Sequence, residues 1–109
     1  MASNSENLKT IVAKLDTLGY PIAWGNFNKE QVFPYLVYLE EAPQNMGADN
    51  NSYIKVRNYR IEYYFTELEP AKEEAVEQAI SELDSNYSSS GATYIESDTC
   101  YVNYYYIQL

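Results

Sequence analysis

Carboxylates are the residues of this sequence with the greatest potential for chemistry, because sixteen Asp and Glu accompany seven Lys and Arg and no histidine. Two adjacent pairs stand out, Glu40-Glu41 and Glu73-Glu74. General acid–base catalysis needs two carboxylates that converge from different elements with separated pKa values. Neighbours in sequence do not face each other on a strand or helix. We therefore interpret both pairs as solvated charge.

Metal binding and nucleophilic catalysis are also not indicated. Asp49-Asn50-Asn51 resembles part of a calcium loop, but the EF-hand pattern continues to a Glu at its twelfth position, and no Glu is in that register. With one cysteine and no histidine, the chain cannot build an ordinary zinc site, a Cys–His dyad or a Ser–His–Asp triad. Cys100 lies in an apolar run and is expected to be buried. No glycine-rich phosphate loop is present. We predict no enzymatic activity, no metal and no cofactor.

The composition also argues against nucleic-acid-binding, secreted and membrane-spanning proteins. The net charge of −9 disfavours affinity for nucleic acid, which requires clustered Lys and Arg. An acidic surface instead allows DNA to move past without adhering. The thirteen tyrosines suit half-buried strands and contact surfaces. The N-terminus lacks the pattern of a secretory signal, and the apolar runs are too short to span a membrane. These features predict a cytoplasmic origin and no membrane partner.

The length predicts one domain, over residues 1–109. The helical and strand segments described next predict that this domain is of the α+β class. Apolar residues spaced for one helix face predict a helix over 1–19, with a Ser3–Glu6 capping box at its start and Gly19 and Pro21 at its end. Its buried face comprises Leu8, Ile11, Val12, Leu15 and Leu18.

A second helix is predicted to begin at Glu69-Pro70 and to end near 84–86. Its expected buried face comprises Ala71, Ala75, Val76, Ala79, Ile80 and Leu83. We interpret 87–91 as a flexible connector, followed by a hairpin of 92–96 and 99–109 about Ser97-Asp98. The last strand is apolar on both faces, which predicts a central or covered position.

Three strands are expected between the helices: 22–26, an inner strand at 35–39, and a long strand over 53–66. Trp24 is interpreted as core or edge packing rather than a ligand platform. The order is therefore α-β-β-β-α-β-β, a single mixed or antiparallel sheet with two helices packed on one face. Residues 40–52 form a polar loop between the second and third strands, and so long a loop is uncommon in a compact domain unless it is functional or disordered.

The long strand has two apolar sets of opposite parity. Tyr59, Ile61, Tyr63 and Phe65 alternate with polar residues, whereas Ile54 and Val56 fall on the other face. Either a bulge or strong twist occurs near Arg57-Asn58, or the first half projects as an arm of an extended β-hairpin with 35–41 and meets another subunit. Met46, the apolar residue of the loop, either folds back on the core or contacts a partner.

The order of these segments resembles the small tail-terminator or tail-completion proteins of long-tailed bacteriophages and prophages. The resemblance starts at the helix ending in LGYPIAWGNF and continues through 34–38, the loop 45–50, Tyr53 and the strand with Arg60-Ile61-Glu62 and Tyr64. The acidic helix after Glu69-Pro70 and the hairpin at 94–97 also fit. The match covers nearly the whole chain through loose motifs. The terminus Tyr104-Tyr105-Tyr106 departs from it and has no family role that we can assign.

The resemblance implies a virion structural protein that forms a homo-hexameric ring at the head-proximal end of the tail tube. Such a ring ends tube polymerisation and provides the head-attachment surface. The implied partners are further copies of the chain, the tail tube protein and the head–tail connector or stopper protein, while DNA passes through the lumen without specific binding. The subunit or partner interface is expected at Asn45, Met46, Ala48, Asp49, Asn50, Tyr53, Ile54 and Val56.

Two alternatives stay open. The chain is either another head–tail joining or minor tail protein of the same particle, or a small acidic monomeric binding or inhibitor module. Ring stoichiometry and position in the particle distinguish the first alternative, and the oligomeric state distinguishes the second.

Overall fold

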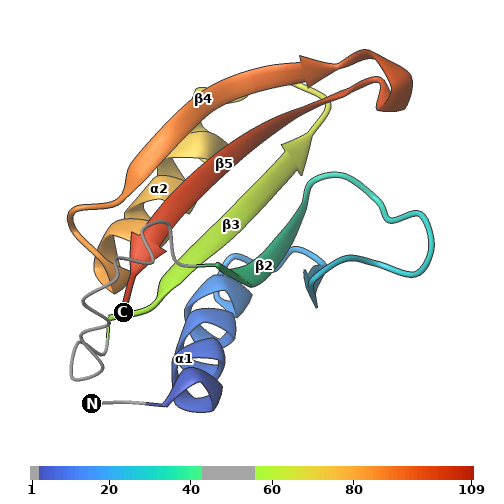
Figure 1. Ribbon diagram of the computed structural model, residues 1–109. Helices are drawn as coiled ribbons and strands as arrows, with labels where there is room; N and C mark the ends of the chain where they lie inside the picture. Colours follow the sequence, from blue (N-terminus) through green and yellow to red (C-terminus); the bar gives the residue numbers. More distant parts are fainter. Residues whose placement is uncertain (1–2, 43–55) are drawn as a thin grey trace.

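The computed structural model describes residues 3–42 and 56–109. It contains one five-stranded sheet in the order β1-β2-β3-β5-β4 and two α-helices, so the predicted α+β class and element order are confirmed (Figure 1). The elements are α1 (Asn4–Asp16), β1 (Ile22–Trp24), β2 (Tyr35–Glu41), β3 (Asn58–Phe65), α2 (Pro70–Leu83), β4 (Ser88–Ile95), the 3-10 turn η1 (Glu96–Asp98) and β5 (Cys100–Gln108).

The sheet is mixed. β1 runs parallel to β2, and the pairs β2–β3, β3–β5 and β5–β4 are antiparallel. β2 and β5 both have neighbours on two sides, as predicted for an inner second strand and a central last strand. None of the described helices is both long enough and apolar enough to cross a membrane.

The predicted capping box starts α1. The Glu6 backbone N–H donates to Ser3 Oγ over 3.1 Å, and the Ser3 N–H donates to Glu6 Oε1 over 2.9 Å, which satisfies two otherwise unpaired donors. The helix ends at Asp16, three residues earlier than predicted, because a turn precedes Gly19. Gly19 has φ of +81°, the left-handed conformation expected of it.

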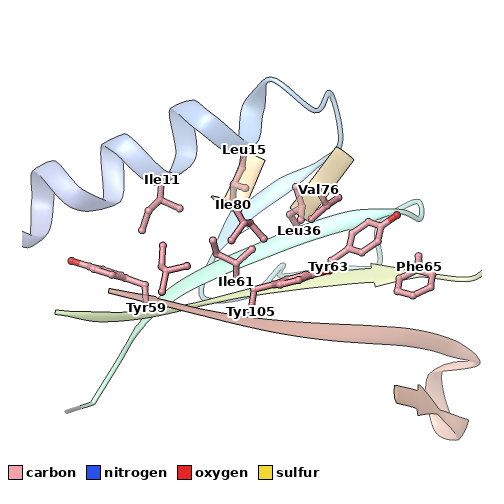
Figure 2. Close-up of a cluster of buried hydrophobic side chains, with 11 residues drawn as sticks. Ile11, Leu15, Leu36, Tyr59, Ile61, Tyr63, Phe65, Val76, Ile80 and Tyr105 are labelled. Carbon is pink, nitrogen blue, oxygen red and sulfur yellow. The ribbon is translucent and has the colours of Figure 1, made fainter. Parts of the chain in front are cut away.

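Both helices cover one face of the sheet, and the hydrophobic core lies between the helices and the sheet (Figure 2). The predicted alternation in β3 is confirmed, because Tyr59, Ile61, Tyr63 and Phe65 are all buried on this side. Ile11 and Leu15 of α1 and Val76 and Ile80 of α2 pack against them, together with Leu36, Tyr105 and Ile107 of the neighbouring strands. In α2, the predicted buried residues Ala71 and Ala75 are instead exposed, because the helix contacts the sheet through a narrower stripe.

Of the two explanations offered for the change of parity, a bulge near Arg57-Asn58 is not present in the β3–β5 pairing, and the projecting arm lies almost entirely outside the described residues. Arg57 and Leu109 exchange two backbone hydrogen bonds of 2.8 and 2.9 Å, which extend the β3–β5 register from Asn58–Gln108 without interruption. The irregularity lies instead in β4, between Ser89 and Ala92, where Gly91 has φ of +79°. Ser89 Oγ accepts the Gly91 N–H, which stabilises this bend locally.

The predicted flexible connector over 87–91 is also wrong in part. β4 begins at Ser88, and its pairing with β5 starts at Ser88–Tyr106. The serines fit the strand because Ser89 Oγ donates to Asn103 Oδ1 and Ser90 Oγ accepts the Tyr104 N–H. Side-chain hydrogen bonds thus replace part of the ladder at the bulge.

Candidate interaction surface

The face of the sheet opposite the helices carries the most concentrated polar and aromatic chemistry of the described chain. Side chains alternate between the two faces of a strand, so the neighbours of the core residues lie here. We call this surface the open face. The pairing of β2, β3 and β5 places its residues side by side, and they include Tyr35, Leu39, Glu41, Asn58, Arg60, Glu62, Tyr64, Tyr104, Tyr106 and Gln108.

Arg60 is the centre of the open face. Its Nε donates to Glu62 Oε2 over 2.8 Å, its other end forms an ion pair with Glu41, and its guanidinium lies 5.5 Å from the centre of the Tyr104 ring. Burial alone lowers the Arg60 pKa, but the hydrogen bond and charge of Glu62, followed by the charge of Glu41, outweigh it, so the pKa is raised. One fixed cation therefore holds two carboxylates.

Glu62 has both of its oxygens occupied. Oε2 accepts from Arg60, and Oε1 accepts the Tyr64 hydroxyl over 2.7 Å. Burial, followed by the hydrogen bond to Glu62, raises the Tyr64 pKa, so the hydroxyl keeps its proton and acts as a donor. A carboxylate held by two donors is positioned for structure or recognition rather than for proton transfer.

An aromatic cluster covers one end of the open face. The Tyr35 and Tyr64 rings stack at 4.8 Å, and Phe27 and Phe33 each approach Tyr35 at 5.3 Å. Both phenylalanines belong to the segment that joins β1 to β2, so this connection folds against the sheet. The other end, with Tyr106 and Gln108, is exposed.

The sequence-predicted interface lies almost entirely outside the described residues. Asn45, Met46, Ala48, Asp49, Asn50, Tyr53 and Ile54 all belong to 43–55, and only Val56 is described. Val56 is 47% exposed. The base of the predicted hairpin is present, because β2 and β3 pair antiparallel as far as Glu41–Asn58.

A groove of about 520 Å³ lies beside this hairpin base. Val56 and Ala42 line it from the hairpin, and Tyr106 and Leu109 from the end of β5 and beyond. The Asp84 carboxylate, also in the lining, accepts the Gln108 N–H over 2.9 Å. Its lining mixes apolar and polar groups without a converging set of catalytic side chains.

A second groove, of about 470 Å³, lies at the opposite edge of the sheet. Leu8, Val12, Trp24 and Tyr38 give it apolar walls, and Lys9 lies at its rim with Asn4 and Ser5. We call it the β1-edge groove. Trp24 was predicted to pack in the core or at an edge; it lies on edge strand β1 but is 66% exposed, so it is not a core residue.

Two features bear on metal binding and thiol chemistry in the part of the chain that the structure describes. No group of three or more His, Cys, Asp or Glu side chains there is arranged to hold a metal ion. Cys100 is buried, as predicted, and burial followed by the charge of Asp98 raises its thiol pKa. A buried thiol with a raised pKa is a poor nucleophile.

The glutamates interpreted as solvated charge are partly engaged. Arg57 pairs with Glu40 over 2.9 Å, and Arg60 pairs with Glu41. Arg60, Glu62 and Tyr64 share a parity in the sequence, which places them on one face of a strand. The register of β2 and β3, which brings Glu41 beside Arg60, cannot be derived from that parity. Register is a long-range property of the β2–β3 pairing.

Comparison with protein-family models, with curated protein sequences and with solved structures found no match to this chain.

Proposed function

We propose that this chain is a tail terminator of a long-tailed bacteriophage or prophage, a virion structural protein. In this role, copies of the chain form a ring on the head-proximal end of the tail tube, end its polymerisation and present the surface to which the head connector attaches. The chain is made in the host bacterial cytoplasm and functions in the virion.

The open face is the observation that carries the proposal. Its Arg60, Tyr64, Tyr104 and Tyr106 belong to the residue types enriched at protein interfaces. The cation is already held by Glu41 and Glu62, so a partner meets a preorganised surface rather than mobile charges. A surface of this kind supports binding to protein.

Charge supplies a second line of support. Each subunit carries −9, and a ring multiplies this charge around its lumen. A negative lumen lets DNA pass without adhesion because phosphate is repelled at every position. The sequence resemblance, which spans nearly the whole chain, supports the same role.

Deletion of the encoding gene tests the proposal. We expect electron microscopy of lysates from the deleted phage to show tails of uncontrolled length, or tails without heads. Normal virions from the deletion contradict the proposal. Tails of normal length that fail to join heads, with the chain located away from the tube end, favour another head–tail joining protein instead.

Residues 43–55 are expected to contribute to assembly. Met46→Asp is predicted to leave the circular dichroism spectrum and the urea midpoint unchanged and to weaken assembly, because a charge then replaces an apolar contact. Global unfolding of this variant contradicts the interface role and places Met46 in the core.

A further inference from the structure

β4 is a long sheet edge with little of the usual protection. Among the strands that the structure describes it pairs only with β5, and its residues from Ser88 to Tyr94 are all exposed. Natural edge strands are protected by charged residues, proline, bulges or short length. β4 contains no charged residue and no proline, and the bulge at Ser89–Ala92 is its one protective feature. Such an edge favours pairing with another strand.

β1 forms the other edge of the same sheet. Its backbone groups bond to β2 on one side: Leu36 N–H donates to the Pro21 carbonyl, and Gly25 N–H donates to the Tyr38 carbonyl. Ile22 and Trp24 alternate along the chain with Pro21 and Gly25, the residues that bond to β2, so the N–H groups of Ile22 and Trp24 point to the outer edge of the sheet. The β1-edge groove lies beside this edge, and its described lining contains a lysine and no carboxylate.

We propose that β4 of one subunit pairs antiparallel with β1 of a second copy of this chain, in a head-to-tail contact. β1 runs with β2 and β5, whereas β3 and β4 run in the opposite direction. Consider a second copy placed beside the β4 edge, with its strands in the same orientation and its helices on the same side of the sheet. The β1 strand of that copy then lies antiparallel to β4. This inference rests on the proposed ring, because head-to-tail contacts that close generate rings.

The charges at the two edges are complementary in this arrangement. Antiparallel pairing places the start of β4, and with it the C-terminal end of α2, near Trp24 and Lys9 of the neighbouring copy. The last turn of α2 contains no basic residue, and Asp84 follows it. The negative end of a helix is stabilised by a nearby cation, which Lys9 supplies.

A contact between two β4 strands fits the charges less well. α2 lies behind β4 and β5 (Figure 1), so an antiparallel two-fold pairing brings two α2 helices to the same side of the joined sheet. These helices carry Glu73, Glu74 and Glu77, and like charges that face each other oppose association. The head-to-tail contact avoids this repulsion.

Two variants that each disable one edge test the proposal. Ala92→Lys places a charge on β4, and Trp24→Lys places a charge in the β1-edge groove. Ala75→Lys, at an exposed position of α2, is a matched control for charge and size. We expect sedimentation velocity to show oligomers for the wild-type chain and for Ala75→Lys, and monomers for each edge variant alone. Circular dichroism is expected to show all of them folded.

Mixing the two edge variants gives the decisive result. Ala92→Lys keeps an intact β1 edge and Trp24→Lys keeps an intact β4 edge, so an equimolar mixture is expected to form dimers that grow no further. A mixture that stays monomeric overturns the proposal. Self-association of Trp24→Lys alone also overturns it, because it indicates β4–β4 pairing. Unchanged assembly of Ala92→Lys, or a wild-type chain that is monomeric at millimolar concentration, overturns it as well. Dimers in the mixture together with normal tails in the gene deletion overturn the proposed function but not this contact.

Discussion

Replacement of Arg60 by alanine probes the charge cluster of the open face. Arg60 is the cation that Glu41 and Glu62 share, so its removal leaves both carboxylates without a cation. The Glu62 side chain is only 10% exposed, and that of Glu41 is 21% exposed. Water can therefore compensate the lost charge only in part.

The expected cost follows from this burial. Breaking a fully buried ion pair costs about 3–5 kcal/mol, and a typical surface pair contributes about 0–1 kcal/mol. Arg60 is 30% exposed, between these limits, so we expect Arg60→Ala to lower the free energy of unfolding by about 2–3 kcal/mol. Tyr64 can still donate to Glu62, which prevents a larger loss.

Arg57→Ala is the matched control, because Arg57 also lies on the β3 side of the hairpin base and also pairs with a glutamate of β2. Its ion pair with Glu40 is more exposed, with the two side chains at 47% and 30%. We expect its removal to cost about 0–1 kcal/mol.

Urea denaturation of both variants measures the difference. A double-mutant cycle with Glu62→Gln isolates the Arg60–Glu62 coupling, which we expect at about 1–2 kcal/mol, within the range found for residues in direct contact. Equal costs for Arg60→Ala and Arg57→Ala, or a coupling near zero, would show that the cluster is no more than surface charge.

Three further predictions concern stability. Ile61→Ala is expected to lower the free energy of unfolding by about 2–5 kcal/mol because Ile61 is fully buried, whereas the exposed Leu68→Ala is expected to change it by less than about 0.5 kcal/mol; urea denaturation compares them, and similar values contradict the core assignment. Ser3→Ala is expected to cost about 1 kcal/mol, measured as a lower thermal midpoint, because it removes the cap of α1, and an unchanged midpoint contradicts the capping box. Burial raises the pKa of Tyr63 from 10.0 to about 12, so the folded chain holds a proton that the unfolded chain releases. This contribution is fully present below pH 10 and is lost as pH rises through about 12; urea midpoints that do not fall over this interval contradict it.

Local patterns predicted much of the fold. The Ser3–Glu6 box, the parity of β3 and the order of the elements all depend on short-range periodicity, and each is present in the structure. The sequence did not predict β4 from Ser88, because serine and glycine are typical of connectors and form a strand here only through pairing with β5. Tertiary contacts overrode local propensity at this point.

The candidate surface was harder to predict from the sequence than the fold. Arg60, Glu62 and Tyr64 share a parity that the sequence shows, but the third member of the charge cluster, Glu41, joins them only through the β2–β3 register. The sequence also left open, at Val56, the choice between a bulge and a projecting arm. Arg57 continues the ladder to Leu109 without a bulge, and Val56 is exposed beyond the end of the sheet.

The most direct test of the central claim uses tube polymerisation in vitro. Under the proposed function the chain acts on a tail tube protein of the same phage or prophage; that protein is polymerised with and without the purified chain, and tube lengths are measured by electron microscopy. We predict that the chain shortens the tubes in proportion to its concentration and adds a ring at one end only. Tubes of unchanged length, with no added density at either end, contradict the account.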